Sequence, residues 1–383
     1  MSRLKKRIAH LYASPKWSGL VIPLTTIMLS FLLVSILFLI IGRDPVKALY
    51  SFFQGAGLGL KPSYTKQGGM LTDFFSFLGI LAPMLLAALG VVVGLKGGMF
   101  NIGISGQMLF SGFLATVLVG YSSLPPFIAV PLVLLIGIVA GGTLGAFIGW
   151  LKYRFNIHEV VSSIMLNYIV SYATGYVIKT KYVDPIIRSS RAIKPNARLM
   201  IGGVKLAGQT IDIPIGIVIA LLCVFLIRFF LNRMTAGFEI KMVGLNKECA
   251  EYAGVRINRV TVRALVLSGM LAGLAGVTYY LGFYRTMTPK DLASLGFDSI
   301  AVAFLGNLNP VSCIFSSMLI TIFQKGAVYM GSVTGIVREI ASVITGILLL
   351  FSALGSYIKD IAVRYSQRFP LKPEDEASTE VER

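Results

Sequence analysis

The sequence of 383 residues contains little charge, and one long stretch contains none. Asp, Glu, Lys and Arg make up 14% of the chain, and 55% of the residues are hydrophobic. A soluble domain usually has about 25% charged residues. Residues 97–151 include no member of these four types. This composition excludes an ordinary soluble domain and predicts a polytopic membrane protein, an all-α helix bundle in lipid.

The residues that carry most enzyme chemistry are also scarce. The chain has two histidines and three scattered cysteines, and His158-Glu159 lacks the second histidine that a zinc-protease helix requires. It has no Gly-Lys dipeptide, so the phosphate-binding loop that ends in Gly-Lys-Ser/Thr is absent. We therefore expect a protein that is not an enzyme and binds no metal or cofactor itself. Any ATP and magnesium would be used by a partner subunit.

Acidic residues are half as numerous as basic ones. The chain has 17 Asp and Glu against 35 Lys and Arg, a formal net charge of +18. No module that combines stacked aromatic and basic side chains accompanies this excess. It therefore predicts attraction to anionic membrane lipid, and no binding of nucleic acid.

The charge-free runs predict about ten membrane helices, at about 20 residues per crossing. The runs 97–151 and 299–337 are each long enough for two helices, and one helix of the second pair is short. All the predicted membrane helices belong to one domain, 17–358, which lies between a basic tail at 1–16 and a second tail at 359–383. Basic residues before the first run place the N-terminus in the cytoplasm, and ten spans return the C-terminus to the same side. The other spans are 17–42, 74–95, 160–178, 213–227, 264–284 and 340–358.

Polar side chains interrupt the charge-free run at residues 101–107. If this segment is helical, Asn101 and Ser105 share a face, and Gln107 is turned about 200° from Ser105. Asn101 and Ser105 would then line a path, while Gln107 bonds a neighbouring helix. The alternative is that all three only join helices by hydrogen bonds. The same two interpretations apply to a polar group in the next span, Ser162, Ser163 and Asn167.

The segment 232–263 is the largest predicted cytoplasmic connection. Asn246 can cap a short helix, Glu248 suits its first turn, and Gly254 can end it. A helix of about two turns on this face would suit docking of a soluble partner. The alternative is an ordinary surface helix that covers the bundle.

Glycine recurs at every fourth position of one predicted helix, and Gly269 and Gly273 repeat the spacing in another. This spacing allows another helix backbone to approach closely, so it predicts helix packing. The four positions are Gly137, Gly141, Gly145 and Gly149.

Four stretches resemble bacterial ABC import permeases for nucleosides and simple sugars, a family related to ribose and branched-chain amino-acid permeases. Residues 94–107 resemble the signature Gly-Leu-Phe-Asn-Ile-Gly-x-Glu-Gly-Gln, with Ser105 in place of the customary Glu. Residues 159–168, 237–255 and 297–310 are similar to the family's fifth span, its cytoplasmic coupling loop and the region around its eighth span. The resemblance covers roughly residues 75–355.

The resemblance implies a type II ABC importer in the bacterial cytoplasmic membrane. Its partners would be ATPase subunits, a second permease subunit and an extracellular substrate-binding lipoprotein. The long N-terminal region favours a paralogue as the second permease. The residues implied in coupling to the ATPase are Gly237, Glu239, Gly244, Asn246, Glu248, Ala250 and Gly254.

The resemblance adds Asp298 and Asn307 to the substrate pathway. Asp298 and Glu159 each stand at the start of a predicted helix, where a carboxylate also compensates the helix dipole. The sequence Ile-Met-Leu-Asn-Tyr at 164–168 and the long coupling loop most resemble the nucleoside permeases of the family, and this favours nucleosides as the solute. The alternatives are a simple sugar, such as ribose or galactose, and a stand-alone ion-coupled carrier. The carrier is disfavoured because the spans offer almost no buried ionisable residue.

Overall fold

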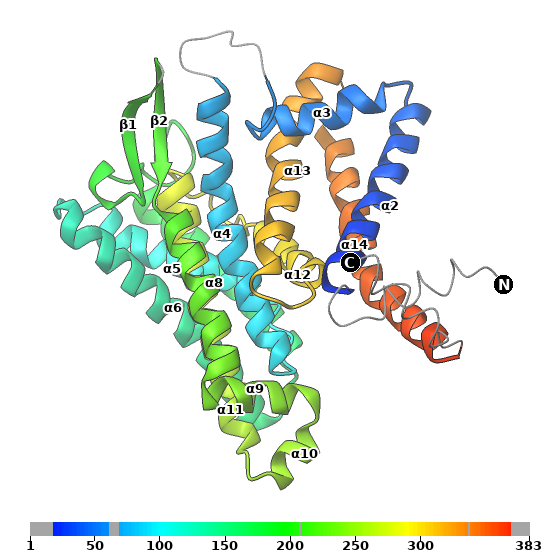
Figure 1. Cartoon of the computed structure of the whole chain (residues 1–383). Helices are drawn as coiled ribbons and strands as arrows, with labels where there is room; N and C mark the ends of the chain where they lie inside the picture. Colours follow the sequence, from blue (N-terminus) through cyan, green and yellow to red (C-terminus); the bar gives the residue numbers. More distant parts are fainter. Residues whose placement is uncertain (1–17, 61–68, 207, 336–337, 369–383) are drawn as a thin grey trace.

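The computed structural model describes residues 18–60, 69–206, 208–335 and 338–368, and these form a helix bundle with one β-hairpin (Figure 1). The predicted basic tail at 1–16 and the end of the second tail, 369–383, lie outside the described residues. The helices are α2 (Ser18–Ile40), α3 (Pro45–Gly55), α4 (Met70–Lys96), α5 (Ile104–Ala115), α6 (Pro126–Phe155), α7 (Glu159–Val177), α8 (Gly216–Arg233), α9 (Thr235–Leu245), α10 (Lys247–Tyr252), α11 (Ile257–Val277), α12 (Leu295–Leu305), α13 (Ser312–Thr334) and α14 (Arg338–Arg368).

The eight apolar runs correspond to ten helices in the predicted order, with two helices in each of the runs 97–151 and 299–337. Among the described residues, six helices are long and apolar enough to cross a membrane: α4, α6, α7, α8, α11 and α13. A seventh results if Met28–Ile40 and α3 are counted as one span bent by 118°. Shorter apolar helices occur at Ile104–Gly120 and at α12, so the short eighth span is confirmed as a short helix. The polytopic helical bundle is confirmed.

The connector after the first span contains a helix that the sequence analysis left out. Asp44 caps α3, because its Oδ1 accepts hydrogen bonds from the backbone N–H of Val46 (2.9 Å) and Lys47 (3.3 Å). Helix α3 packs against α13, where a Cβ on Gly55 would lie 2.8 Å from the Cα of Gly326. It therefore lies across one end of the bundle, above α13 in Figure 1.

Helix α4 runs through the centre of the bundle (Figure 1). It packs against α8, α11, α12 and α13, and every residue from Leu81 to Gly94 is buried. A helix that is apolar on all sides is stable only when it is surrounded, which explains this position. The main hydrophobic core therefore forms around α4.

The glycine spacing of α6 brings this helix into close contact with α11. A Cβ on Gly141 would lie 2.1 Å from the carbonyl oxygen of Gly269, and a Cβ on Gly273 would lie 1.9 Å from that of Gly137. Gly145 faces the carbonyl of Leu265 in the same way. The prediction of helix packing is confirmed for these positions, and Gly149 lies against Val262 at the same crossing.

One end of the bundle carries the hairpin of β1 (Met200–Leu206) and β2 (Gln209–Pro214), which adds a small sheet to the predicted all-α fold. At this hairpin end, α5, α7 and α11 finish in π-helical turns, Thr116–Gly120, Ile178–Tyr182 and Thr278–Phe283. The loop that follows α7 covers them through backbone hydrogen bonds, for example from Lys194 to Gly120 and from Leu199 to Leu281.

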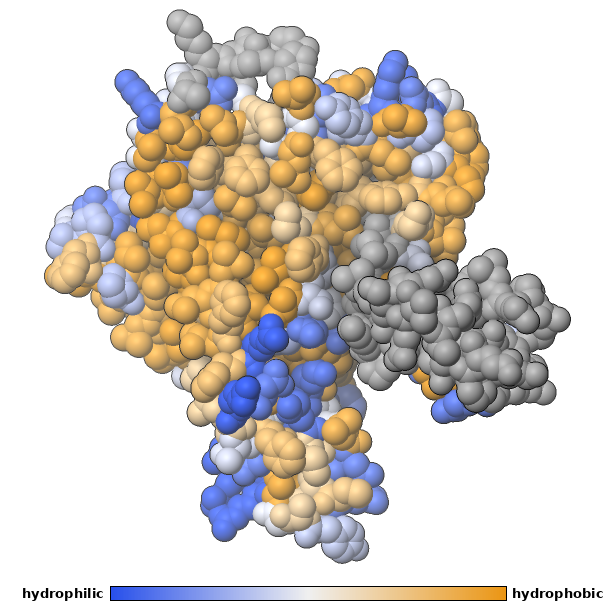
Figure 2. Space-filling model, viewed as in Figure 1, coloured by the Kyte–Doolittle hydropathy of each residue, from blue (hydrophilic) through white to orange (hydrophobic). Residues whose placement is uncertain are grey.

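The opposite end carries α9 and α10, which project from the bundle (Figure 1). This projection is largely hydrophilic, whereas the broad middle of the molecule presents an apolar surface (Figure 2). An apolar middle between two more polar ends is the surface that a membrane-spanning bundle requires.

Candidate functional site

The segment that follows α4 forms the centre of a buried polar cluster, defined by Asn101, Ser105, Gln107, Asn167 and Ser268. Asn101 Nδ2 donates to Ser268 Oγ on α11 (2.9 Å) and to Gln107 Oε1 (3.1 Å), and its Oδ1 accepts from the Gly103 backbone N–H (3.0 Å). None of the cluster residues is more than 2% exposed. The cluster therefore ties the 101–107 segment to its neighbours inside one subunit.

The helical arrangement predicted for residues 101–107 is wrong. Helix α5 begins at Ile104, so Asn101 lies in the preceding loop and does not share a helix face with Ser105. Gln107 bonds Asn101 of its own segment, and not a neighbouring helix. The glycines explain the break, because Gly98 has a positive φ of 70° directly after α4.

Asn167 on α7 takes the place of a capping residue for α5. Its Oδ1 accepts a hydrogen bond from the backbone N–H of Gly106 (2.9 Å), and its Nδ2 donates to the carbonyl of Ile102 (3.1 Å). The first N–H groups of a helix have no partner within it, and Gly103 provides no side chain to accept from them. Asn167 thus supplies a cap from another span.

Ser105 connects α5 to the region around α12. Its Oγ donates to the carbonyl oxygen of Ala293 (2.9 Å), and a Cβ on Gly296 would lie 2.3 Å from the same Oγ. The glutamate that is customary at this position of the permease signature has a longer side chain than serine. Gly296 lies so close to Ser105 that its backbone fills the space next to the serine hydroxyl.

Gln107 keeps one unused donor. Its Nε2 is buried and has no hydrogen-bond partner among the described residues. An unpaired buried amide N–H costs about 1–3 kcal/mol, so a bound group or water that accepts from it would be stabilised. Gln107 is therefore a cluster residue whose side-chain amide nitrogen is left without a partner among the described residues.

The other predicted pathway residues are spread over three places. Ser162 and Ser163 donate to backbone carbonyls of their own helix, and Ser163 also lies against Gly103. Asp298, in the first turn of α12, accepts a hydrogen bond from Gln324 Nε2 on α13 (2.6 Å). Asn307 is exposed in the turn between α12 and α13, so the structure does not bring it to the polar cluster.

Glu159 is a buried carboxylate beside the polar cluster. It lies in the first turn of α7, pairs with Lys152 at the end of α6, and accepts from the Phe100 backbone N–H (3.4 Å). Its position agrees with compensation of the helix dipole, and it also joins α6 and α7 to Phe100, the residue before Asn101.

The predicted short helix of the 232–263 segment is confirmed as α10. Asn246 Oδ1 accepts from the Cys249 backbone N–H (3.0 Å), Glu248 lies in the first turn, and Gly254 ends the segment at a φ of 81°. Ala250 is buried in a small apolar cluster with residues of α9 and α11. Helix α10 is therefore held on the bundle and is not a loose loop.

The remaining residues implied in coupling fix α9 to the membrane helices. A Cβ on Gly237 would lie 2.1 Å from the Phe230 carbonyl oxygen of α8, and one on Gly244 would lie 2.1 Å from that of Lys96 of α4. Glu239 pairs with Arg263 of α11 at 3.3 Å. Helix α9 is therefore in direct contact with α4, α8 and α11.

Two apolar side chains at this projection were missed by the sequence analysis. Leu245 is 83% exposed and Tyr252 is 95% exposed, at the ends of α9 and α10. The period of a two-turn helix is too short to predict which side faces outward. Both side chains therefore face away from the bundle.

A row of tyrosines on α7 was missed as well. Tyr168, Tyr172 and Tyr176 follow one another at every fourth position and are 55–69% exposed. The Lys290 Nζ lies 4.8 Å from the ring centroid of Tyr172. The spacing is readable from the sequence, but only the structure shows that these tyrosines are exposed and that none of the described helices covers them.

The residues that the structure describes contain no group of three or more His, Cys, Asp or Glu that could hold a metal ion. Outside the spans, burial and the neighbouring Arg285 lower the pKa of Arg198, and Asp212 opposes this shift. These charges belong to the loops of the hairpin end, away from the polar cluster.

Comparison with known proteins identifies the family. The family described as branched-chain amino acid transport system, permease component, matches residues 74–353. The nucleoside ABC transporter permease protein NupB of Lactococcus lactis is 31% identical over 88% of this chain and 92% of its own length. The guanosine ABC transporter permease protein NupP of Bacillus subtilis is 34% identical over 71% and 78%. The glucose ABC transporter permease protein TsgB13 of Haloferax volcanii is 25% identical over 90% of each chain. This chain therefore belongs to the family of branched-chain amino acid transport system permease components, the multi-pass membrane subunits of ABC transporters.

Proposed function

We propose that this chain is a permease subunit of an ATP-driven importer of nucleosides. The observation that carries the proposal is the similarity, over most of both chains, to permeases named for nucleoside and guanosine transport. Glucose is a second candidate solute, favoured by the more distant similarity to a glucose permease.

The proposed orientation places the hairpin end outside the cell and α10 in the cytoplasm. Two ATPase subunits would bind below the two permeases, one of them at α10 of this chain, with Leu245 and Tyr252 as exposed apolar contacts. Because α9 is fixed to the ends of α4 and α8 through Gly244 and Gly237, closure of the ATPases would move these spans together. A second permease, different from this chain, and an extracellular binding lipoprotein would complete the importer.

The exposed face of α7 is the surface that we assign to the solute pathway. Tyr168 to Tyr176 covers about 12 Å along the helix axis, so these hydroxyls are not all at one membrane interface. Helices α7 and α13 are the least apolar of the candidate spans. Less than half of the most apolar part of α7 is buried within the chain. Such a face suits a water-containing path between two permeases, where tyrosine rings can stack on a nucleobase.

The polar cluster would then support the pathway from behind. Asn101, Ser105 and Asn167 use their hydrogen-bonding groups within the chain, which favours helix joining over solute contact. Gln107 retains a donor that a solute or a water can use. Asp298 and Asn307 remain proposed pathway residues at other depths of the bundle.

Uptake of labelled uridine by intact cells, with and without this gene, tests the solute. We expect gene-dependent uptake that excess adenosine reduces, whereas excess glucose, ribose or leucine leaves it unchanged. Loss of glucose or ribose uptake without loss of uridine uptake would reject the nucleoside and keep the family.

A further inference from the structure

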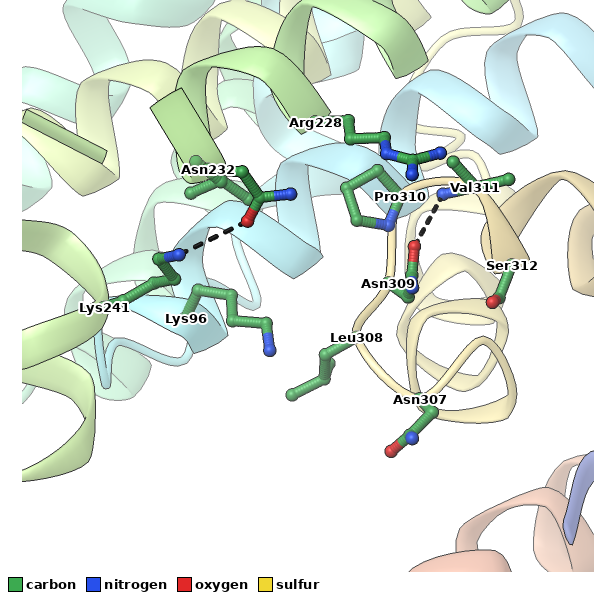
Figure 3. Close-up of a pocket in the computed structure, with 11 residues that line it drawn as sticks. Lys96, Arg228, Asn232, Lys241, Asn307, Leu308, Asn309, Pro310, Val311 and Ser312 are labelled. Carbon is green, nitrogen blue, oxygen red and sulfur yellow. Dashed lines mark hydrogen bonds between the residues drawn. The ribbon is translucent and has the colours of Figure 1, made fainter. Parts of the chain in front are cut away.

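A cavity outside the polar cluster lies at the end of the bundle that carries α10. It has a volume of about 400 Å³ and lies between the ends of α4 and α8, helix α9 and the turn from α12 to α13 (Figure 3). Three of its lining residues are cations, Lys96, Arg228 and Lys241, and none is acidic. We call this cavity the basic pocket.

The other polar groups of the basic pocket add to its preference for an anion. Helix α13 begins at Ser312 on its wall, directly after Val311, whose backbone N–H donates to Asn309 Oδ1 (3.0 Å). The N-terminal end of a helix carries partial positive charge, and here it faces the basic pocket although the Val311, Cys313 and Ile314 N–H groups have partners within the chain. The Lys241 Nζ donates to Asn232 Oδ1 (3.3 Å), which fixes one cation at the rim. A compact group with several acceptor oxygens, such as a phosphate, matches this surface.

A second cavity of about 330 Å³ adjoins the basic pocket and shares Arg228 and Asn232 with it. Phe225 and Phe229 line this second cavity, one helical turn apart on the outer side of α8, and both are exposed. Helix α8 is one of the candidate spans, and Arg228 lies near its end, at the depth where basic side chains reach lipid headgroups. The two cavities thus present cations and apolar rings side by side.

We propose that these two cavities form one binding site for an anionic phospholipid. The basic pocket holds the headgroup phosphate, and an acyl chain lies along Phe225 and Phe229. A free phosphate ion would use only the cations, whereas the phospholipid also uses the neighbouring apolar cavity. The lipid would link α8 to the turn between α12 and α13, which approach each other across the basic pocket (Figure 3).

The test measures lipid bound to the purified transporter complex in detergent by native mass spectrometry. The probes are phosphatidylglycerol and phosphatidylcholine with the same acyl chains. The variants are Arg228→Gln, Lys241→Gln and Phe225→Ala. The matched control is Arg154→Gln, since Arg154 is an exposed cation at the end of α6 that lines neither cavity.

We expect phosphatidylglycerol to bind in preference to phosphatidylcholine. Each of Arg228→Gln and Lys241→Gln should lower its affinity about five-fold, the factor that corresponds to about 1 kcal/mol per basic residue. Phe225→Ala should also lower it, Arg154→Gln should leave it unchanged, and millimolar inorganic phosphate should leave most of the lipid bound.

Equal binding of the two lipids, or equal losses in Arg154→Gln and Arg228→Gln, would overturn the proposal. Displacement of the lipid by inorganic phosphate, with no effect of Phe225→Ala, would also overturn it, because the site would then bind phosphate itself. Size-exclusion chromatography of each variant complex separates loss of lipid from loss of assembly.

Discussion

The crossing of α6 and α11 predicts that Gly141→Ala destabilises the protein. A Cβ on Gly141 would lie 2.1 Å from the Gly269 carbonyl oxygen and 2.7 Å from the Gly273 Cα. Comfortable contacts between non-bonded heavy atoms are about 3.5 Å, so the two helices would have to separate by about 1.4 Å at this point. The obstructing atoms are backbone and cannot rotate away.

Two effects of opposite sign determine how much Gly141→Ala changes the free energy of unfolding. Alanine is the better helix former by about 1 kcal/mol, so helix propensity alone predicts a gain in stability. Overpacking costs about 1–3 kcal/mol, and contact with backbone atoms places this site at the upper end of that range. We expect a net loss of about 2 kcal/mol in the free energy of unfolding.

The assay is denaturant unfolding of the purified protein in mild detergent, with Gly142→Ala as the matched control. A Cβ on Gly142 would meet the side chain of Met270 at 3.0 Å, and that flexible side chain can move. Gly142→Ala should therefore be close to the wild type in stability. A Gly141→Ala protein as stable as the wild type would show that the crossing of α6 and α11 tolerates a Cβ at this position. Gly141→Leu should prevent assembly, and a normal complex yield with changed solute choice would contradict a packing role.

Three further substitutions test the cap of α5, the coupling helix and the tyrosine face. Asn167→Leu leaves the Gly106 N–H without its partner and should lower the free energy of unfolding by about 1–3 kcal/mol; an unchanged denaturant midpoint would contradict this. Asn246→Ala removes the cap of α10, worth about 1 kcal/mol, and should lower the amount of solute moved per ATP hydrolysed while the bundle stays folded. An unchanged ratio of transport to hydrolysis would count against coupling at α10. Tyr168→Ala should reduce nucleoside uptake about tenfold, as expected when one aromatic stacking partner is lost, and Tyr168→Phe should retain most of it. Equal uptake by both Tyr168 variants would argue against stacking.

The fold was largely predictable because hydrophobicity and glycine spacing act locally along the chain. A charge-free run of about 20 residues must form a helix in lipid, and each of the ten predicted spans contains a helix, although six or seven helices among the described residues are long and apolar enough to cross a membrane. The glycine repeat predicted a close helix contact, although the repeat alone did not identify α11 as the partner of α6. Helix α3 was missed because its apolar pattern is too short for a span, and its signal was only Asp44 before Pro45.

The site was less predictable, because the role of a polar residue depends on where the chain turns. Asn101 and Ser105 have helical spacing, but the glycines around them end α4 and delay α5 until Ile104. Asn167 was predicted as a polar residue of a span, but its capping of α5 requires knowledge of how α7 packs. The same knowledge is needed to see that the tyrosines of α7 are exposed. In both cases tertiary contacts between distant segments decide the outcome.

We propose that this chain moves nucleosides in a complex driven by ATP. The most direct test of this proposal is uptake of labelled uridine by proteoliposomes that contain the co-purified complex and its binding lipoprotein, with ATP and magnesium supplied on the ATPase side. We predict accumulation with ATP, and none with a non-hydrolysable analogue or with an imposed proton or sodium gradient. Accumulation that follows the ion gradient and does not require ATP would contradict ATP-driven transport and indicate an ion-coupled carrier.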